Sequence, residues 1–252
     1  MTSGPTTVPV GREPELAEQT VVVVGGTSGI GLETARRARA EGADVIVTAR
    51  NADRLQTVGL ELQASIAAFD ATDFDRLERF FDALPSPVDH VLVTGPGPYY
   101  AALADWDVEE GRRDADARLW LPLHLARNAM GKVRPGGTLL FIGGTGGRPP
   151  VTGRVGTGPV TAALPALTRN LALQLAPIRV NLIAVGFVDT PLAATILGDR
   201  LDTRRAQLRT MLPIRRVVGP ADVAALAVHV MANTAITGAT FDIDGGQQLV
   251  EG

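Results

Sequence analysis

The chain contains no cysteine among its 252 residues and only three histidines, which are widely separated. Without thiols it can form neither a disulfide nor a zinc-thiolate site, and the histidine spacing does not suit metal ligation. It also lacks a run of about 18 apolar residues, and its first residues lack the basic start and apolar core of a signal peptide. We therefore expect no metal site, no membrane segment and a cytoplasmic protein.

Neither sign of charge dominates, because 24 lysines and arginines stand against 27 aspartates and glutamates. The basic residues are spread along the chain, which argues against nucleic-acid binding. Hydrophobic residues make up 45% and charged residues 20%, as is typical of a folded globular domain. We predict one domain over residues 19–252, preceded by a loosely held tail over residues 1–18 that has three prolines and no apolar periodicity.

Short runs of β-branched residues alternate with longer stretches of helical periodicity along the whole domain. This pattern predicts a single-domain α/β fold, a Rossmann-type doubly wound parallel β-sheet of about seven strands with helices on both faces. The predicted strands are Val21–Val24, Asp44–Thr48, Ala64–Phe69, His90–Thr94, Thr138–Ile142, Arg179–Ala184 and Ala239–Ile243. The predicted helices are Gly29–Glu41, Ala52–Glu61, Phe74–Ala83, Glu109–Val133, Pro159–Leu175, Leu192–Met211 and Pro220–Met231. Pro165 predicts a kink or a late start in the fifth helix.

A glycine-rich turn, VVVVGGTSGIG, joins the first predicted strand to the first predicted helix. Its glycines permit a tight turn, close approach of the backbone to a pyrophosphate, and close packing of the helix on the sheet. The free N–H groups and positive dipole end of that helix favour phosphate. We therefore predict a dinucleotide site whose phosphates are held by Gly25, Thr27, Ser28, Gly29, Ile30 and Gly31.

The end of the second predicted strand indicates which dinucleotide is bound. An NAD site places a carboxylate there for the adenosine ribose, but this strand is followed by Arg50 and Asn51. A guanidinium offers a planar fork of donors that suits a 2′-phosphate. The sequence therefore favours NADP(H) over NAD(H), with a solvated surface arginine as the alternative interpretation of Arg50.

Several further segments, together with the glycine-rich turn, resemble the short-chain dehydrogenase/reductase family. FDATD is similar to the family segment that meets the adenine, LVTGPG to its LVNNAG motif, and IRVNLIAVGFVDTP to its IRVN…PGxxxT segment beside the nicotinamide. The resemblance covers nearly the whole chain and implies the family fold, a nicotinamide cofactor and a small-molecule substrate. It adds these predicted cofactor residues: Asp70, Ala71, Gly95, Gly97, Gly186, Val188 and Thr190.

The family's catalytic residues are missing from the positions that the resemblance implies. Thr157 and Thr161 stand at the tyrosine and the lysine, Gly144 at the serine and Arg118 at the asparagine. A Tyr-x-x-x-Lys motif cannot exist anywhere, because Lys132 is the single lysine and both tyrosines, Tyr99 and Tyr100, lie far before it.

Few residues could replace the phenol as the acid. Taking water, with a pKa of about 15.7, as a stand-in for an alcohol, a threonine hydroxyl lies roughly six units above a phenol, on the order of 8 kcal/mol. Thr145 and Thr157 are therefore poor acids and are expected to cap the loop or to hydrogen-bond a ligand. Tyr99 follows the fourth strand and is the candidate acid, with an aromatic lid as the alternative role for Tyr99 and Tyr100.

Two functions are compatible with this sequence. The first is an NADP(H)-dependent oxidoreductase with an atypical or missing proton donor that reduces a small carbonyl, enone or imine compound. The second is a catalytically silent NADP(H)-binding sensor or regulator, or a non-redox enzyme, on the same scaffold. The resemblance also implies a homodimer or homotetramer formed through the two long helices predicted over Glu109–Val133 and Pro159–Leu175.

Overall fold

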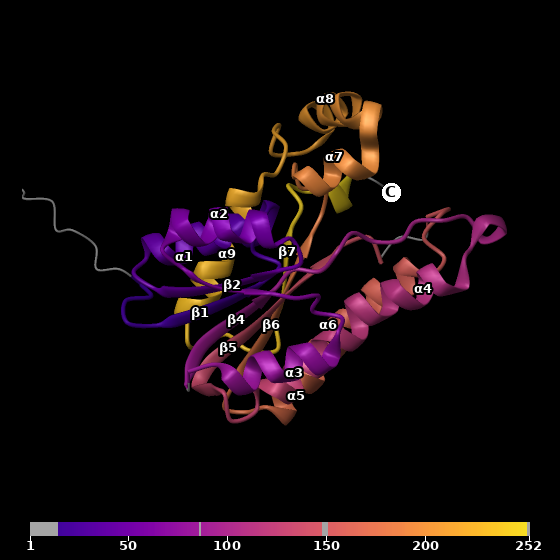
Figure 1. Cartoon of the computed structure of the whole chain (residues 1–252). Helices are drawn as coiled ribbons and strands as arrows, with labels where there is room; N and C mark the ends of the chain where they lie inside the picture. Colours follow the sequence, from indigo (N-terminus) through magenta and orange to yellow (C-terminus); the bar gives the residue numbers. More distant parts are fainter. Residues whose placement is uncertain (1–14, 86, 148–150, 251–252) are drawn as a thin grey trace, which may run out of the picture.

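A computed structural model describes residues 15–85, 87–147 and 151–250, which form a three-layer α/β structure around one parallel sheet (Figure 1). Its strand order is β3-β2-β1-β4-β5-β6-β7. The strands are β1 Thr20–Val24, β2 Asp44–Ala49, β3 Ser65–Ala68, β4 Val88–Val93, β5 Val133–Gly144, β6 Arg179–Val185 and β7 Thr240–Ile243. The predicted seven-stranded Rossmann-type sheet is confirmed.

Helices cover both faces of the sheet, with α1, α2 and α9 on one side and α3, α5 and α6 on the other (Figure 1). Their bounds are α1 Gly29–Ala40, α2 Ala52–Leu62, α3 Phe74–Ala83, α4 Val108–Ala115, α5 Leu121–Ala129, α6 Thr157–Gln174, α7 Pro191–Leu197, α8 Leu201–Met211 and α9 Pro220–Ala232. The valines of β1 show why two layers form. Val21 and Val23 belong to the core under α1 and α9, whereas Val22 and Val24 belong to the opposite core, because strand side chains alternate in direction.

Two of the long predicted helices are interrupted. The helix predicted over Glu109–Val133 is divided into α4 and α5 by a π-helical turn, Asp116–Trp120, and ends at Ala129. Pro122 has no N–H for the carbonyl of Arg118, so regular α-helical bonding cannot continue through this turn. The helix predicted over Leu192–Met211 breaks at Gly198, whose φ of +50° is not helical.

The other departures from the prediction are small. Helix α6 begins at Thr157, eight residues before Pro165, so the predicted late start is wrong. Strand β5 begins five residues earlier than predicted, at Val133. Most of the predicted tail, residues 1–14, lies outside the described residues, but Leu16 is fully buried against the core under α1 and α9.

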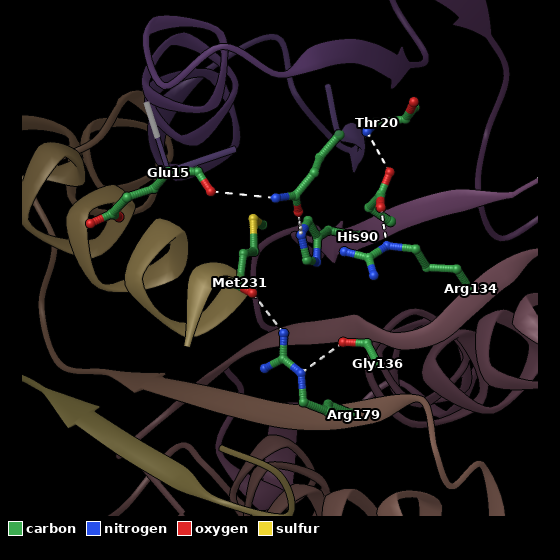
Figure 2. Close-up of polar contacts among 9 residues, drawn as sticks. Glu15, Thr20, His90, Arg134, Gly136, Arg179 and Met231 are labelled. Atoms are coloured by element: carbon green, nitrogen blue, oxygen red, sulfur yellow. Dashed lines mark hydrogen bonds and ion pairs between the residues drawn. The ribbon is translucent and has the colours of Figure 1, made fainter. Parts of the chain in front are cut away.

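A partly buried polar network joins the amino ends of the central strands (Figure 2). The carboxylate of Asp89 accepts the backbone N–H of Thr20 at 2.7 Å and pairs with the guanidinium of Arg134. Next to it, the Nε2 atom of His90 lies 2.6 Å from the side-chain oxygen of Gln19. Strand β6 adds Arg179, whose guanidinium donates to carbonyl groups of Gly136 and of helix α9. This network holds together the amino ends of the strands, opposite their carboxyl ends.

His90 makes the fold sensitive to acid. Burial, and more weakly the charges of Arg179 and Arg134, lower the pKa of His90 to about 3 against the opposing effect of Asp89. Because the unfolded chain takes up this proton near pH 6.5, stability is complete above that pH and falls as the pH approaches 3. We expect a loss of about 3 kcal/mol at pH 4, measured by urea unfolding.

The matched variant for this prediction is His90→Gln, whose amide can still donate to Gln19. It is expected to lose stability less steeply than the wild type between pH 6.5 and pH 4. Parallel loss in both proteins would show that other groups cause the acid sensitivity.

Candidate functional site

A cavity of about 580 Å³ opens at the carboxyl ends of β1, β4, β5 and β6. Ser28, Gly29, Ile30 and Gly31 of the glycine-rich turn line one end, and α6 lines the other through Thr157 and other residues. Strand order reverses between β1 and β4, and in doubly wound sheets ligands bind outside the carboxyl ends at such a point. The cavity therefore lies where the sequence predicts the site.

The glycine-rich turn has no room for side chains at two of its glycines. Gly25 has a φ of +89°, and a Cβ there would lie 2.4 Å from the hydroxyl oxygen of Thr94. A Cβ on Gly31 would lie 2.3 Å from the carbonyl oxygen of Gly25. Helix α1 then begins at Gly29, with no side-chain cap from Ser28 and no acidic residue in its first turn. The first turn of α1 therefore has no negatively charged side chain that would repel a phosphate.

At the predicted adenine end, the structure brings together Arg50 and Asp70. The Nη1 atom of Arg50 lies 3.8 Å from a carboxylate oxygen of Asp70, and the Arg50 side chain is 72% exposed. Burial raises the pKa of Asp70, but hydrogen bonds from Thr72 and the charge of Arg50 outweigh it and lower the pKa overall. Asn51 has a structural task as well, since its side-chain oxygen accepts the N–H of Arg54 and caps α2.

The ends of β4 and β6 complete the predicted cofactor wall. The hydroxyl of Thr94 donates to the carbonyl groups of Val24 and Gly25, which ties β4 to the phosphate turn. After β6, a Cβ on Gly186 would lie 2.6 Å from the Cβ of Asp244, so only glycine fits. Thr190 caps α7 by accepting the N–H of Ala193. Two other predicted cofactor residues on this wall, Gly95 and Val188, also line the cavity. Gly97 is not among the described lining residues.

The four positions of the missing catalytic residues meet in this cavity. Gly144, Thr157, Thr161 and Arg118 all line it. The Nη2 atom of Arg118 donates to the hydroxyl oxygen of Thr161 at 2.6 Å. The hydroxyl of Thr157 is buried and has no hydrogen-bond partner among the described residues. Sequence reasoning placed these residues individually but missed the contact between Arg118 and Thr161, which lie 43 positions apart.

The two tyrosines have different environments. Tyr99, the candidate acid, accepts the backbone N–H of Asp107 at 3.0 Å through its hydroxyl and packs against Trp106, with ring centroids 5.1 Å apart. Among the described residues that line the cavity, Tyr100 is present and Tyr99 is not. Arg154 lies 5.8 Å from the ring centroid of Tyr100. Tyr99 therefore shows the geometry of the alternative role, packing in the loop.

The charged side chains among the described residues that line the cavity are all arginines. The described lining includes the guanidinium groups of Arg118, Arg154 and Arg204, and it contains no carboxylate, histidine or lysine. No group of three histidines or carboxylates among residues 15–85, 87–147 and 151–250 could hold a metal ion. Within the same ranges, the helices are all too short or too polar to cross a bilayer.

Residues 24–248 match the family model described as enoyl-(acyl carrier protein) reductase. The short-chain dehydrogenase/reductase ATR9 of Stachybotrys chlorohalonatus is 30% identical, and the match covers 94% of this chain and 99% of that protein. The chain belongs to the short-chain dehydrogenase/reductase family of oxidoreductases. This family binds nicotinamide cofactors and small-molecule substrates.

Other members of the short-chain dehydrogenase/reductase family are similar over the same length. The 3-oxoacyl-[acyl-carrier-protein] reductase MabA of Mycobacterium tuberculosis is 29% identical, over 95% of this chain and 96% of its own. Among solved structures, the MalC reductase/Diels-Alderase of Malbranchea aurantiaca has a TM-score of 0.86 at 25% identity, covering 94% of this chain and 99% of that one. A small-chain dehydrogenase in complex with NADPH has a TM-score of 0.79 at 27% identity, covering 92% and 99%.

Proposed function

We propose that the chain binds NADP(H) and reduces a small carbonyl, enone or imine compound by hydride transfer. The observation that carries this proposal is the cavity itself, which is lined both by Gly29 of the phosphate turn and by Thr157 and Thr161 on α6. A cofactor placed along it would bring its reactive ring to the α6 end, where the remaining space can take a substrate.

The residues of the cavity fit this cofactor. Gly25 and Gly31 leave a cradle that a Cβ would fill, and the first turn of α1 offers backbone N–H groups to the pyrophosphate. Thr27 and Ser28 would add hydroxyl groups, and Gly186 and Thr190 would hold the nicotinamide end. When bound, the reduced cofactor supplies the hydride. The protein orients the two reactants.

The preference for NADP(H) rests on Arg50, which is exposed beside the adenine end. We expect Arg50→Gln to weaken NADPH binding about tenfold to a hundredfold and to leave NADH binding almost unchanged, because only the 2′-phosphate uses the guanidinium. Calorimetric titration measures both affinities. The matched control is Arg54→Gln, an exposed arginine in the first turn of α2. An equal loss for both nucleotides would contradict the assignment.

The reaction is tested by mixing the protein with NADPH and a panel of ketones, enones and imines while nicotinamide absorbance is recorded. Oxidation that depends on both substrate and protein supports the proposal. Tight NADPH binding without turnover of any of the three classes would favour the second candidate, a sensor or regulator. The observation in favour of that candidate is the described cavity lining, whose only phenol is Tyr100 and which has no lysine.

The proposal includes self-association through α4, α5 and α6. Leu173 on α6 is 80% exposed and Trp120, in the π-helical turn, is 48% exposed, which is unfavourable for large apolar side chains in a monomer. Light scattering should give the mass of a dimer or tetramer. A monomer mass at micromolar concentration would contradict this part.

A further inference from the structure

The π-helical turn Asp116–Trp120 carries an arginine into the cavity. The side chain of Arg118 is 14% exposed, and its Nη2 atom donates to the hydroxyl oxygen of Thr161 at 2.6 Å. This distance is short for such a bond and is typical of a charge-assisted contact. Turns of this kind occur frequently at functional sites.

The direction of this hydrogen bond gives the Thr161 hydroxyl its role. A guanidinium can only donate, so the Thr161 oxygen is the acceptor and its own proton is left to donate elsewhere. Thr161 is 6% exposed and lines the cavity. A hydroxyl polarised in this way is a stronger donor to an oxygen atom placed in the cavity.

One carboxylate, that of Asp114, lies beside the guanidinium of Arg118. Asp114 lies 3.7 Å from its Nε atom, is itself buried, and also accepts the backbone N–H of Tyr99 at 3.1 Å. The Nε atom has no hydrogen-bond partner among the described residues. Arg154 adds positive charge to the same cavity, and no carboxylate lines its described part. The cavity therefore favours an anion over a cation.

We propose that Thr161, polarised by Arg118, holds the negative charge that forms on the substrate oxygen during reduction, and that the substrate is an α,β-unsaturated carbonyl compound. This inference rests on the proposed function and narrows its substrate class. Thr161 is the group that touches the oxygen, and Arg118 is its positioning residue. The pair supplies a positive charge where the family places a lysine, which this chain lacks.

The reaction balances without a phenol. A hydride supplied by the reduced cofactor would add to the β-carbon, and the carbon–carbon π electrons would move to form an enolate while the cofactor is oxidised to NADP⁺. The enolate oxygen accepts the proton of Thr161 as a hydrogen bond, and the α-carbon later takes a proton from water. The product is the saturated carbonyl compound.

The two other substrate classes fit less well. A ketone would become an alkoxide, which needs a proton at once, and a guanidinium, which stays charged in proteins, is a poor acid for it. A protonated imine needs no acid but carries a positive charge, which Arg118 and Arg154 disfavour. An enolate needs a stabilising charge and no strong acid, and the cavity provides this combination.

Binding of an oxyanion mimic tests the role of the pair separately from turnover. We would titrate the NADP⁺-loaded protein with 4-nitrophenol, whose anion is coloured, and with 4-nitrotoluene as a neutral probe of similar shape. The wild type should shift bound nitrophenol toward its anion. Thr161→Val and Arg118→Gln should each weaken binding of the anion about tenfold to a hundredfold and leave 4-nitrotoluene binding unchanged.

Three variants keep this test decisive. Thr161→Val leaves the contact between Arg118 and Asp114 intact, so it remains informative if Arg118→Gln fails to fold. Thr161→Ser should restore binding of the anion, and Arg112→Gln, an arginine 70% exposed on α4, is the matched charge control. If Thr161→Val weakened binding of the anion and of the neutral probe equally, Thr161 would only shape the cavity, and the proposal would be overturned.

Kinetics test the substrate class. With an enone, Thr161→Val should lower kcat about tenfold to a hundredfold without changing the affinity for NADPH. Faster turnover of an iminium ion than of an enone by the wild type would overturn the substrate assignment. If NADPH binds but no compound is reduced, the proposed function fails, whereas the anion preference of the nitrophenol test would still report on Arg118 and Thr161.

Discussion

Replacing Gly31 with alanine is expected to abolish measurable NADPH binding, with at least a hundredfold loss of affinity on the order of 3 kcal/mol. The added Cβ would lie 2.3 Å from the carbonyl oxygen of Gly25 and 3.1 Å from the Cα of Gly26. Both neighbours are backbone atoms, so no side-chain rotation can relieve the clash. The turn would have to open, and the backbone N–H groups would no longer converge on the phosphates.

Calorimetric titration and urea unfolding measure the two consequences of Gly31→Ala. The free energy of unfolding should fall by about 2 kcal/mol, as is usual for overpacking in a close contact. The matched control is Gly158→Ala within α6, where a Cβ would meet only the Cβ of Arg154, at 3.7 Å. That control should bind NADPH normally and gain up to about 1 kcal/mol in stability. Normal NADPH affinity in Gly31→Ala would refute the close-approach explanation.

The largest loss of stability is expected for Arg179→Met, about 3 kcal/mol or more. Arg179 is only 5% exposed, and its guanidinium donates to five carbonyl groups. Figure 2 shows two of these bonds, to Gly136 and Met231. The other carbonyl groups belong to Val230, Asn233 and Ile236. Burial lowers the pKa of Arg179, as does the nearby charge of Arg134. Methionine would fill the volume but leave buried acceptors at the end of α9 without donors.

Urea unfolding of Arg179→Met, Arg179→Lys and the exposed control Arg169→Met separates the causes. Lysine keeps the charge but cannot present a planar fork, so it should recover only part of the stability. Arg169→Met should change stability by less than about 0.5 kcal/mol. The folded fraction of each variant should bind NADPH normally. Arg179 lies at the amino ends of the strands, whereas Gly31 lies beyond their carboxyl ends. Wild-type stability in Arg179→Met would show that water replaces the lost donors.

Features that depend on nearby residues were predictable from the sequence. The alternation within Val21–Val24 places two valines in each core, and the glycine spacing after it places the phosphate turn and the start of α1. The seven strands could be located because each is a short apolar run between clear breaks. The position of Arg50 directly after β2 was also predictable, whereas its role at the adenine end stays a prediction.

Features that depend on tertiary contacts were not predictable. The bond between Arg118 and Thr161 joins two elements that meet only in the folded protein. The hydroxyl of Tyr99 is engaged by the backbone of the loop that follows it, and no side-chain pattern reveals this. Gly198 ends α7 because of its backbone conformation, although the apolar spacing on either side favours one continuous helix.

The polar network lies at the amino ends of the strands and the cavity at their carboxyl ends. This separation affects how the protein can change. The network of Asp89, His90 and Arg179 secures the architecture far from the cavity, so exchanges at Gly144 or Thr161 leave those anchors untouched. A lineage can therefore discard one set of reactive groups and acquire another while the scaffold keeps its stability. Protein engineers can use the same freedom to install new reactions in this pocket.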